Sequence, residues 1–295
     1  MIPSTPQPSP ERKVPSRKTL ELMLQNGPDI YDAVQQYIDK YNLPYVLKIN
    51  DDNTATLVDT LTPGELHLAK FITIDPETEE MKLRAVKAAK TPYEVLIFGQ
   101  TGTGKEIIAR SMIADRKGNF RAINCAGLPE TLIESILFGH VRGAFTGADR
   151  EKEGFMSEAK DGVLFLDEIS ELPLLMQAKL LRAIQEKRIT KLGATQEEEI
   201  NCKFVFATNR SLQDMVRDHL FREDLYARIS MLEINIKPLK HRLCDCIPIC
   251  KSLQGGDKFL EEYGESLSSG ALDLSHNVRS IQRYVIRYNV WGSIK

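Results

Sequence analysis

The residues from Gly99 to Glu106, GQTGTGKE, have the composition and spacing of a phosphate-binding loop. An apolar strand pattern at 94–98 precedes them and a helical pattern at 107–114 follows, as the G-x-x-x-x-G-K pattern requires. Glycines let backbone N–H groups approach phosphate oxygens, and the lysine reaches the β- and γ-phosphates. A glycine turn beside an unrelated lysine is the alternative interpretation. We expect a nucleotide to be bound by Gly99, Gln100, Thr101, Gly102, Thr103, Gly104, Lys105 and Glu106.

Two acids, Asp167 and Glu168, end a second apolar stretch, GVLFLDEI. Successive side chains of a strand point in opposite directions, so the two carboxylates can take different roles. Asp167 is expected to orient Mg²⁺ and Glu168 to activate an attacking water. Because Glu106 stands where Ser or Thr usually supplies a hydroxyl to the metal, we expect Mg²⁺ to be held more by Asp167 and water. The alternative is a solvated strand end with two unrelated acids.

Short apolar stretches alternate with helical patterns from about residue 75 onward, and these elements must position the two motifs. We expect a helix at 77–90 and further helices after Pro238. The expected strands are 94–98, 120–124, 162–166, 203–207 and 232–236. Strands that alternate with helices predict an α/β fold whose parallel sheet is covered on both faces.

The overall composition excludes several classes of protein. The 295 residues include 39 Lys+Arg and 41 Asp+Glu, for a net charge of −2, which excludes a generic polybasic nucleic-acid binder; direct DNA binding is not evident. No apolar run approaches the roughly 18–20 residues of a membrane span, and the N-terminus lacks the apolar segment of a secretory signal. The five cysteines follow no disulfide pattern, which indicates reduced thiols in a cytoplasm.

Changes in composition divide the chain into four expected segments. A helical pattern at 19–42 is interrupted at Gly27-Pro28, and two strand patterns flank a turn at 50–53. The segments are a disordered, proline-rich tail at 1–18, a small domain of unknown role at 19–70, a nucleotide-binding domain at 71–237 and a short helical lid at 238–295.

A third stretch, ESILFGHVRGAFTGA at 134–148, lies between the two nucleotide motifs. Together with GQTGTGKE and LFLDEI, it makes the chain resemble the AAA+ ATPase domain of bacterial enhancer-binding proteins, which activate sigma-54 RNA polymerase. The resemblance continues through 172–193, 204–212 and 221–229 and is weaker over 240–290. It implies a P-loop NTPase fold, ATP and Mg²⁺ as cofactors, and a homo-oligomeric ring that is expected to be a hexamer.

The hexapeptide GAFTGA is the most specific part of this resemblance, because other AAA+ proteins carry the nucleotide motifs without it. The resemblance implies a surface loop that contacts the sigma factor and moves with the nucleotide state. Phe145 would be an exposed aromatic anchor between glycines that permit hinging. A buried Phe in an ordinary glycine loop is the alternative. The six implied contact residues are Gly143, Ala144, Phe145, Thr146, Gly147 and Ala148.

The same resemblance implies roles for residues around the nucleotide. Asn124 matches an asparagine that restrains the catalytic glutamate. Thr208 and Asn209 match a first sensor at the end of a central strand near the γ-phosphate. Arg279 matches the second sensor, in the lid.

Arg222 and Arg228 match two arginines at the boundary between subunits. A guanidinium that reaches a neighbour's γ-phosphate stabilises charge in the transition state and couples hydrolysis to assembly. Surface ion pairs with Glu223 and Asp224 are the alternative for these two arginines.

The C-terminal part departs from the family pattern. Leu274-Ser275-His276 replaces the usual W-P-G, and Ser280 replaces the usual acid after the sensor arginine. We recognise neither a receiver domain nor a helix-turn-helix domain. The expectation is a minimal form that is constitutively active, controlled by another protein or active from solution.

Two further patterns have alternatives. The cluster His241, Cys244, Cys246 and Cys250 could bind zinc, although thiols in a helix core are the favoured interpretation. Arg279, Arg283 and Arg287 repeat every four residues and could meet nucleic acid, although a solvated helix face is favoured.

The sequence therefore predicts an ATP-hydrolysing AAA+ transcription activator of the bacterial cytoplasm that remodels the sigma-54 RNA polymerase holoenzyme. One alternative is a remodelling ATPase with a different protein client, recruited through residues 19–70. The other is a non-catalytic regulator that binds and titrates sigma-54 polymerase.

Overall fold

The computed structural model describes residues 17–25, 31–40, 45–49, 54–59 and 61–294. Its contacts divide the chain into two compact units, Met1–Thr62 and Pro63–Lys295. The tail predicted at 1–18 lies outside the described residues except for its last two positions, which begin helix α1 (Arg17–Leu24).

In its described residues, the first unit contains two helices and two paired strands. Helix α2 (Tyr31–Lys40) follows α1, and strands β1 (Tyr45–Ile49) and β2 (Ala55–Asp59) pair antiparallel, as their patterns predict. The proposed break at Gly27-Pro28 and the turn at 50–53 lie outside the described residues. A small core joins these elements through Leu20, Leu24, Tyr31, Val34, Ile38 and Leu57.

The second unit is built on a five-stranded parallel sheet with the order β11-β3-β10-β7-β4. Each strand lies within one residue of its predicted bounds. The strands are β3 (Val95–Gly99), β4 (Phe120–Asn124), β7 (Val163–Asp167), β10 (Lys203–Thr208) and β11 (Glu233–Ile236).

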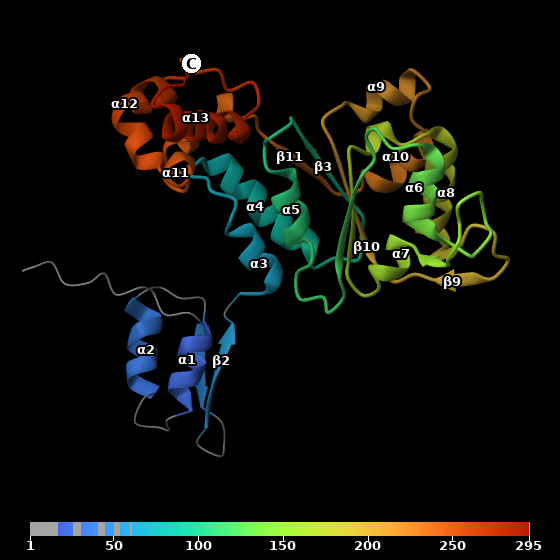
Figure 1. Cartoon of the computed structure of the whole chain (residues 1–295), viewed down its shortest axis with the longest axis horizontal. Helices are drawn as coiled ribbons and strands as arrows, with labels where there is room; N and C mark the ends of the chain where they lie inside the picture. Colours follow the sequence, from blue (N-terminus) through green and yellow to red (C-terminus); the bar gives the residue numbers. More distant parts are fainter. Residues whose placement is uncertain (1–16, 26–30, 41–44, 50–53, 60, 295) are drawn as a thin grey trace, which may run out of the picture. The chain divides into compact units, whose positions relative to one another are not determined.

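Helices cover both faces of this sheet, which confirms the predicted α/β fold (Figure 1). Val163 and Phe165 of β7 pack into the core beneath α4 (Pro76–Ala89) and α5 (Lys105–Ser111). Leu164 and Leu166 of the same strand pack into the opposite core, because successive strand side chains alternate. That second core includes α6 (Glu130–Phe138), α8 (Leu174–Glu186) and α10 (Glu223–Ile229).

Shorter elements surround the sheet, and several of them were not expected from the sequence. Strands of two or three residues carry too few side chains for a periodic pattern to show. These elements are α3 (Pro63–Leu68), α7 (Phe155–Glu158), α9 (Leu212–Arg217), β5 (Gly139–His140), β6 (Lys152–Glu153), β8 (Arg188–Thr190) and β9 (Glu197–Glu199).

The C-terminal segment after Pro238 is helical, as its pattern predicts, and we refer to it as the lid. Its helices are α11 (Cys246–Lys251), α12 (Gly256–Ser268) and α13 (Val278–Trp291), which share a separate core. Cys246 and Cys250 lie inside that core.

Helix α3 packs closely on α5. The Gly64 N–H donates to the Ala114 carbonyl at 3.1 Å, and a Cβ at Gly64 would lie 2.3 Å from the Ser111 carbonyl oxygen. Residues 63–70 therefore group with the nucleotide-binding unit, although composition suggested a domain boundary after residue 70. In the described part of the chain, no helix is both long and apolar enough to cross a bilayer.

Candidate active site

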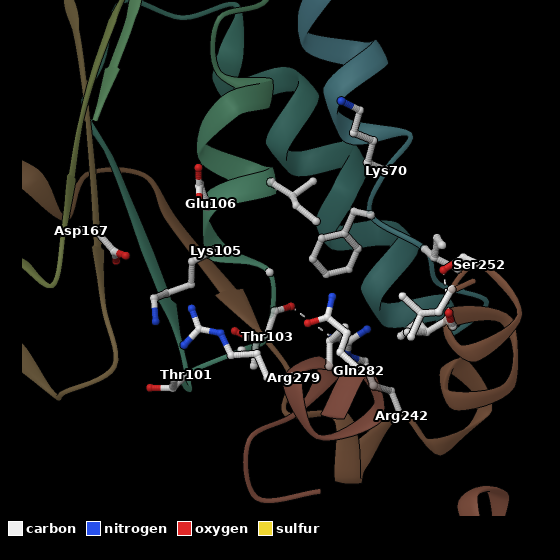
Figure 2. Close-up of a pocket in the computed structure, with 18 of the residues that line it drawn as sticks. Lys70, Thr101, Thr103, Lys105, Glu106, Asp167, Arg242, Ser252, Arg279 and Gln282 are labelled. Carbon is white, nitrogen blue, oxygen red and sulfur yellow. Dashed lines mark hydrogen bonds between the residues drawn. The ribbon is translucent and has the colours of Figure 1, made fainter. Parts of the chain in front are cut away.

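A cavity of about 440 Å³ lies between the phosphate loop, the ends of β4 and β7, and the lid. Figure 2 shows Lys105 and Arg279 extending towards one region from opposite elements, with Asp167 nearby at the end of its strand. Ten of the residues that the sequence singled out line this cavity: Thr101, Gly102, Thr103, Gly104, Lys105, Glu106, Asn124, Asp167, Glu168 and Arg279.

Lys105 is the first residue of α5 and is 7% exposed. Its Nζ donates to the Gly99 carbonyl at 3.0 Å and lies 3.7 Å from Glu168 Oε1. Gly104, which precedes the helix, has φ of 106°, a conformation that side chains resist. A Cβ there would also lie 2.8 Å from the Phe71 ring, so the loop requires glycine at this position.

Asp167 is the last residue of β7 and Glu168 follows it, and the backbone turns sharply there. Glu168 has φ of 51°, in the left-handed region, and such strain is often found at functional sites. Its N–H donates to Asp167 Oδ1 at 3.0 Å. Burial raises the pKa of Asp167, and the nearby Lys105 ammonium opposes that rise. A cation bound beside Asp167 would favour its charged form further.

Glu106 also lines the cavity, but its carboxylate is engaged elsewhere. Glu106 Oε1 accepts hydrogen bonds from Arg110 Nε at 2.9 Å and Nη2 at 2.7 Å, one turn later on the exposed side of α5. Figure 2 shows its side chain set apart from Asp167. The geometry therefore favours Asp167 over Glu106 as the acid that would hold a metal.

The other residues at the strand ends make local contacts. Asn124 lies opposite Asp167 in the sheet, and its Oδ1 accepts from the Ala126 N–H at 2.8 Å. Thr208 is buried at the end of β10, where its hydroxyl accepts from the Arg210 N–H at 3.0 Å. Asn209 Nδ2 donates to Thr101 Oγ1 at 3.3 Å, which ties the first-sensor position directly to the phosphate loop.

The lid is joined to the phosphate loop through Asn277, which sequence reasoning did not single out. Asn277 is 1% exposed and has φ of 54°, and its amide donates to the Thr101 carbonyl at 3.0 Å. Its Oδ1 accepts from the Leu239 N–H at 2.6 Å. The only sequence signal was the place of Asn277 two residues before Arg279, and the W-P-G that usually precedes it is replaced by Leu274-Ser275-His276.

Arg242 was also missed. It is 2% exposed, and it forms a 2.8 Å ion pair with the fully buried Asp245. Arg242 Nη2 donates to the Thr103 carbonyl at 3.3 Å, and Asp245 accepts from the Thr73 hydroxyl at 2.7 Å. This buried pair joins the lid to the phosphate loop and to the segment before α4. No local sequence pattern indicates this pair, because Thr103 and Thr73, which it contacts, are distant in sequence.

Arg222 and Arg228 are not among the residues that line the described cavity. Arg222 binds Asp224 through two hydrogen bonds of 3.0 and 2.7 Å, which is the ion pair that the alternative interpretation expects. Arg228 instead pairs with Glu94 at 3.4 Å. Neither arginine meets the phosphate loop of its own subunit in the described structure.

The GAFTGA segment forms a compact exposed loop between β5 and β6. Its ends are joined by the Gly143 N–H, which donates to the Ala148 carbonyl at 2.8 Å. Phe145 is 42% exposed, and its ring lies edge-on to the buried His140 ring at 5.0 Å. Gly147 has φ of 98° with open space around it. The aromatic ring is thus exposed, in agreement with the contact role that the family resemblance implies.

The members of the His241/Cys244/Cys246/Cys250 cluster lie in different environments, and so do the three arginines of the repeat. Cys246 and Cys250 are buried while Cys244 is exposed, and the described residues contain no group of three or more His, Cys, Asp or Glu arranged to hold a metal. Arg279 lines the cavity, whereas Arg283 and Arg287 lie beside aromatic rings of α13.

Known proteins with similar sequences are regulators. The chain is 38% identical over 224 residues to the sigma54-dependent transcriptional activator SfnR of Pseudomonas putida, covering 75% of this chain and 59% of the relative. It is 44% identical over 175 residues to the regulatory protein AtoC of Escherichia coli, covering 58% and 38%. The chain thus spans about half the length of the curated relatives it matches.

Solved structures share the fold. NtrX from Brucella abortus matches with a TM-score of 0.65 at 24% identity, covering 77% of this chain and 54% of that one. Hsp104 matches with a TM-score of 0.54 at 17% identity, covering 76% and 45%. Both likenesses support the P-loop fold described above. Since residues 71–235, more than half of the chain, match the family described as the Sigma-54 interaction domain, the chain belongs to that family.

Proposed function

We propose that this chain hydrolyses ATP and, as a ring of identical subunits, uses the hydrolysis to remodel sigma-54 RNA polymerase in the bacterial cytoplasm. The observation that carries this proposal is the cavity in which Lys105, Glu168 and Arg279 meet. Membership of the Sigma-54 interaction domain family supports it. So do two structures of NtrX from Brucella abortus, one with ADP and one with ATP bound.

The hydrolytic step needs a base, and Glu168 is the candidate. Its carboxylate would accept a proton from a water molecule as the water oxygen attacks the γ-phosphorus. The bond from that phosphorus to the bridging oxygen breaks, and ADP and phosphate leave. The Lys105 ammonium lies 3.7 Å from the Glu168 carboxylate. When a nucleotide binds, this ammonium can leave Glu168 and pair with the phosphate oxygens instead.

The residues present fit a bound Mg²⁺. Asp167 is half-buried, and burial raises the pKa of its carboxyl, so a divalent cation would stabilise the charged form. Asp167 would hold the ion, with phosphate and water oxygens as the other ligands that Mg²⁺ favours. When bound, the ion would neutralise charge that develops on the phosphate oxygens.

The positions of Arg222 and Arg228 support a ring. Both arginines belong to the α10 region, outside the cavity of their own subunit. A guanidinium there can stabilise a γ-phosphate only if a neighbouring copy presents its nucleotide. We therefore propose that the active form is a hexamer and that a monomer is nearly inactive.

The exposed Phe145 supports the choice of partner. An aromatic ring at the tip of a glycine-flanked loop offers apolar area that an interface can bury. The loop would contact sigma-54, and its movement with the nucleotide state would drive the closed promoter complex towards the open one.

The test is open-complex formation on a sigma-54 promoter with the purified full chain, sigma-54 holoenzyme and ATP. Heparin-resistant complexes should form with ATP and not with ADP, and Glu168→Gln should abolish them. ATP turnover without sigma-54 binding would instead indicate a different protein client. Binding of sigma-54 without any turnover would indicate a non-catalytic regulator. Either result would contradict the proposal.

A further inference from the structure

Glu94, immediately before β3, is a buried acid that two cations share. It is 2% exposed. Arg228 Nη2 lies 3.4 Å from its Oε1, and Lys187 Nζ lies 3.5 Å from the same oxygen. No role for Glu94 follows from the phosphate loop, the acidic strand end or the GAFTGA loop.

The pair between Glu94 and Arg228 is loosely made. Glu94 Oε2 and Arg228 Nε are both buried without a hydrogen-bond partner in the described structure. Arg222, by contrast, holds Asp224 through two hydrogen bonds of 3.0 and 2.7 Å. A guanidinium carries five N–H donors and favours two-pronged contacts with oxyanions, so Arg228 retains donors for a better acceptor.

Lys187 provides the counter-charge that Glu94 would need if Arg228 left. A buried carboxylate without any partner is strongly destabilising. Lys187 ends α8 with φ of 53°, and its ammonium lies 5.2 Å from the centre of the Phe204 ring. Lys187 follows α8 and lies over a ring of β10, whereas Arg228 belongs to α10, so Lys187 can stay beside Glu94 while the Arg228 side chain moves.

We propose that Glu94 is a positioning residue for Arg228. Glu94 holds the guanidinium in a resting position in the separate subunit. It releases the guanidinium to the phosphates bound by a neighbouring copy when the ring assembles, and Lys187 then neutralises Glu94. This inference rests on the proposed function, in which Arg228 acts on a neighbour's nucleotide.

Two substitutions, one at the Glu94 carboxylate and one at its partner Lys187, should act in opposite directions. Glu94→Gln removes the charge that holds Arg228, so release becomes easier. Lys187→Met leaves Arg228 as the main counter-charge of Glu94, so release becomes harder. Glu186→Gln is the matched control, because Glu186 is an exposed acid at the same end of α8 whose partner is Arg182.

The readout is ATP turnover per subunit, measured over a wide range of concentrations of the full chain. We expect Glu94→Gln to lower the concentration at half-maximal turnover about fivefold, the factor that corresponds to ~1 kcal/mol. Lys187→Met should raise it by a similar factor. The rate at saturating protein and the KM for ATP should stay within about twofold in both variants. Glu186→Gln should match the unmodified chain.

Two results would overturn the inference. A lower saturating rate in Glu94→Gln, with an unchanged half-maximal concentration, would mean that Glu94 aims Arg228 permanently. A shift in the same direction for both variants, in proportion to a loss of thermal stability, would mean that Glu94 only supports the fold. Thermal melting of each variant separates these cases. Undiminished turnover in Arg228→Ala would contradict the proposed role of Arg228 in trans, independently of Glu94.

Discussion

The Lys105 ammonium lies 3.7 Å from the Glu168 carboxylate, although the two residues come from different motifs 63 positions apart. The pair places the proposed base beside the cation that would bind phosphate.

We predict that Glu168→Gln lowers ATP turnover by about 10²–10⁴-fold, because the amide cannot accept the proton of the attacking water. Nucleotide binding should persist, since Lys105 and the loop backbone remain. Steady-state phosphate release and binding of a fluorescent ATP analogue check the two parts. Lys105→Ala should instead lose binding, and equal loss of binding in both variants would contradict the assignment of Glu168 as base.

Gly147→Ala should weaken sigma-54 binding while ATP turnover persists. Gly147 has φ of 98° and open space around it, so an added methyl group strains the backbone by about 1–2 kcal/mol without a clash. Gly127→Ala is the matched control, because Gly127 has φ of 74° and equally open surroundings but lies outside the loop. Pull-down with sigma-54 is the measurement. Equal binding by both variants would show that the loop conformation is irrelevant to contact.

Asp245→Asn should destabilise the folded chain by about 3–5 kcal/mol, because it leaves the 2%-exposed Arg242 without its counter-charge. Arg84→Ala removes an exposed ion pair with Glu80 and should cost less than about 1 kcal/mol. Urea unfolding compares the two variants. Similar urea midpoints for the two variants would mean that water reaches the Arg242–Asp245 pair more than its burial indicates.

Lys203 should make stability depend on pH. Burial, aided by the charge of Arg116, lowers the pKa of Lys203 to about 8 from an ordinary value near 10.5. Between these values the unfolded chain binds more protons than the folded one, so the contribution of Lys203 to stability rises from pH 8 to pH 10.5. Its ammonium donates to the Ala88, Thr91 and Tyr93 carbonyls, which limits how far the pKa can fall.

The measurement is the difference in unfolding midpoint between the unmodified chain and Lys203→Met, taken at pH 7.5 and at pH 9.5. Buried thiols oppose the effect, because burial raises the pKa values of Cys125 and Cys202 to about 12 and stability falls once unfolded thiols ionise. Those thiols are present in both proteins and cancel in the difference. A difference that is independent of pH would contradict the lowered pKa of Lys203.

The sheet could be predicted from the sequence because its signal is local. Residues 163–166 are apolar and buried on both faces, and the acid Asp167 marks where the strand ends. The same holds for the phosphate loop, whose glycines and lysine are adjacent in sequence. The position of Asp167 at the end of a parallel strand also places it at the carboxyl edge of the sheet.

Contacts between distant segments could not be predicted. The Glu94–Arg228 and Asp245–Thr73 contacts join residues 134 and 172 positions apart, and neither acid belongs to a recognisable pattern. The ring contact between His140 and Phe145 depends on a two-residue strand, too short for periodicity to indicate. For Arg222 the structure shows the Asp224 ion pair that the sequence left as an alternative.

Asn277 couples the movement of the lid to that of the phosphate loop. Its side chain bonds the Thr101 carbonyl on one side and the Leu239 N–H on the other, and the next N–H, of Val278, donates to the Gly102 carbonyl at 3.1 Å. The lid cannot swing away from the loop without breaking the bonds to Thr101 and Gly102 together. Opening is therefore cooperative, and exchange of the Val278 amide proton with solvent should report it and should slow when a nucleotide is bound.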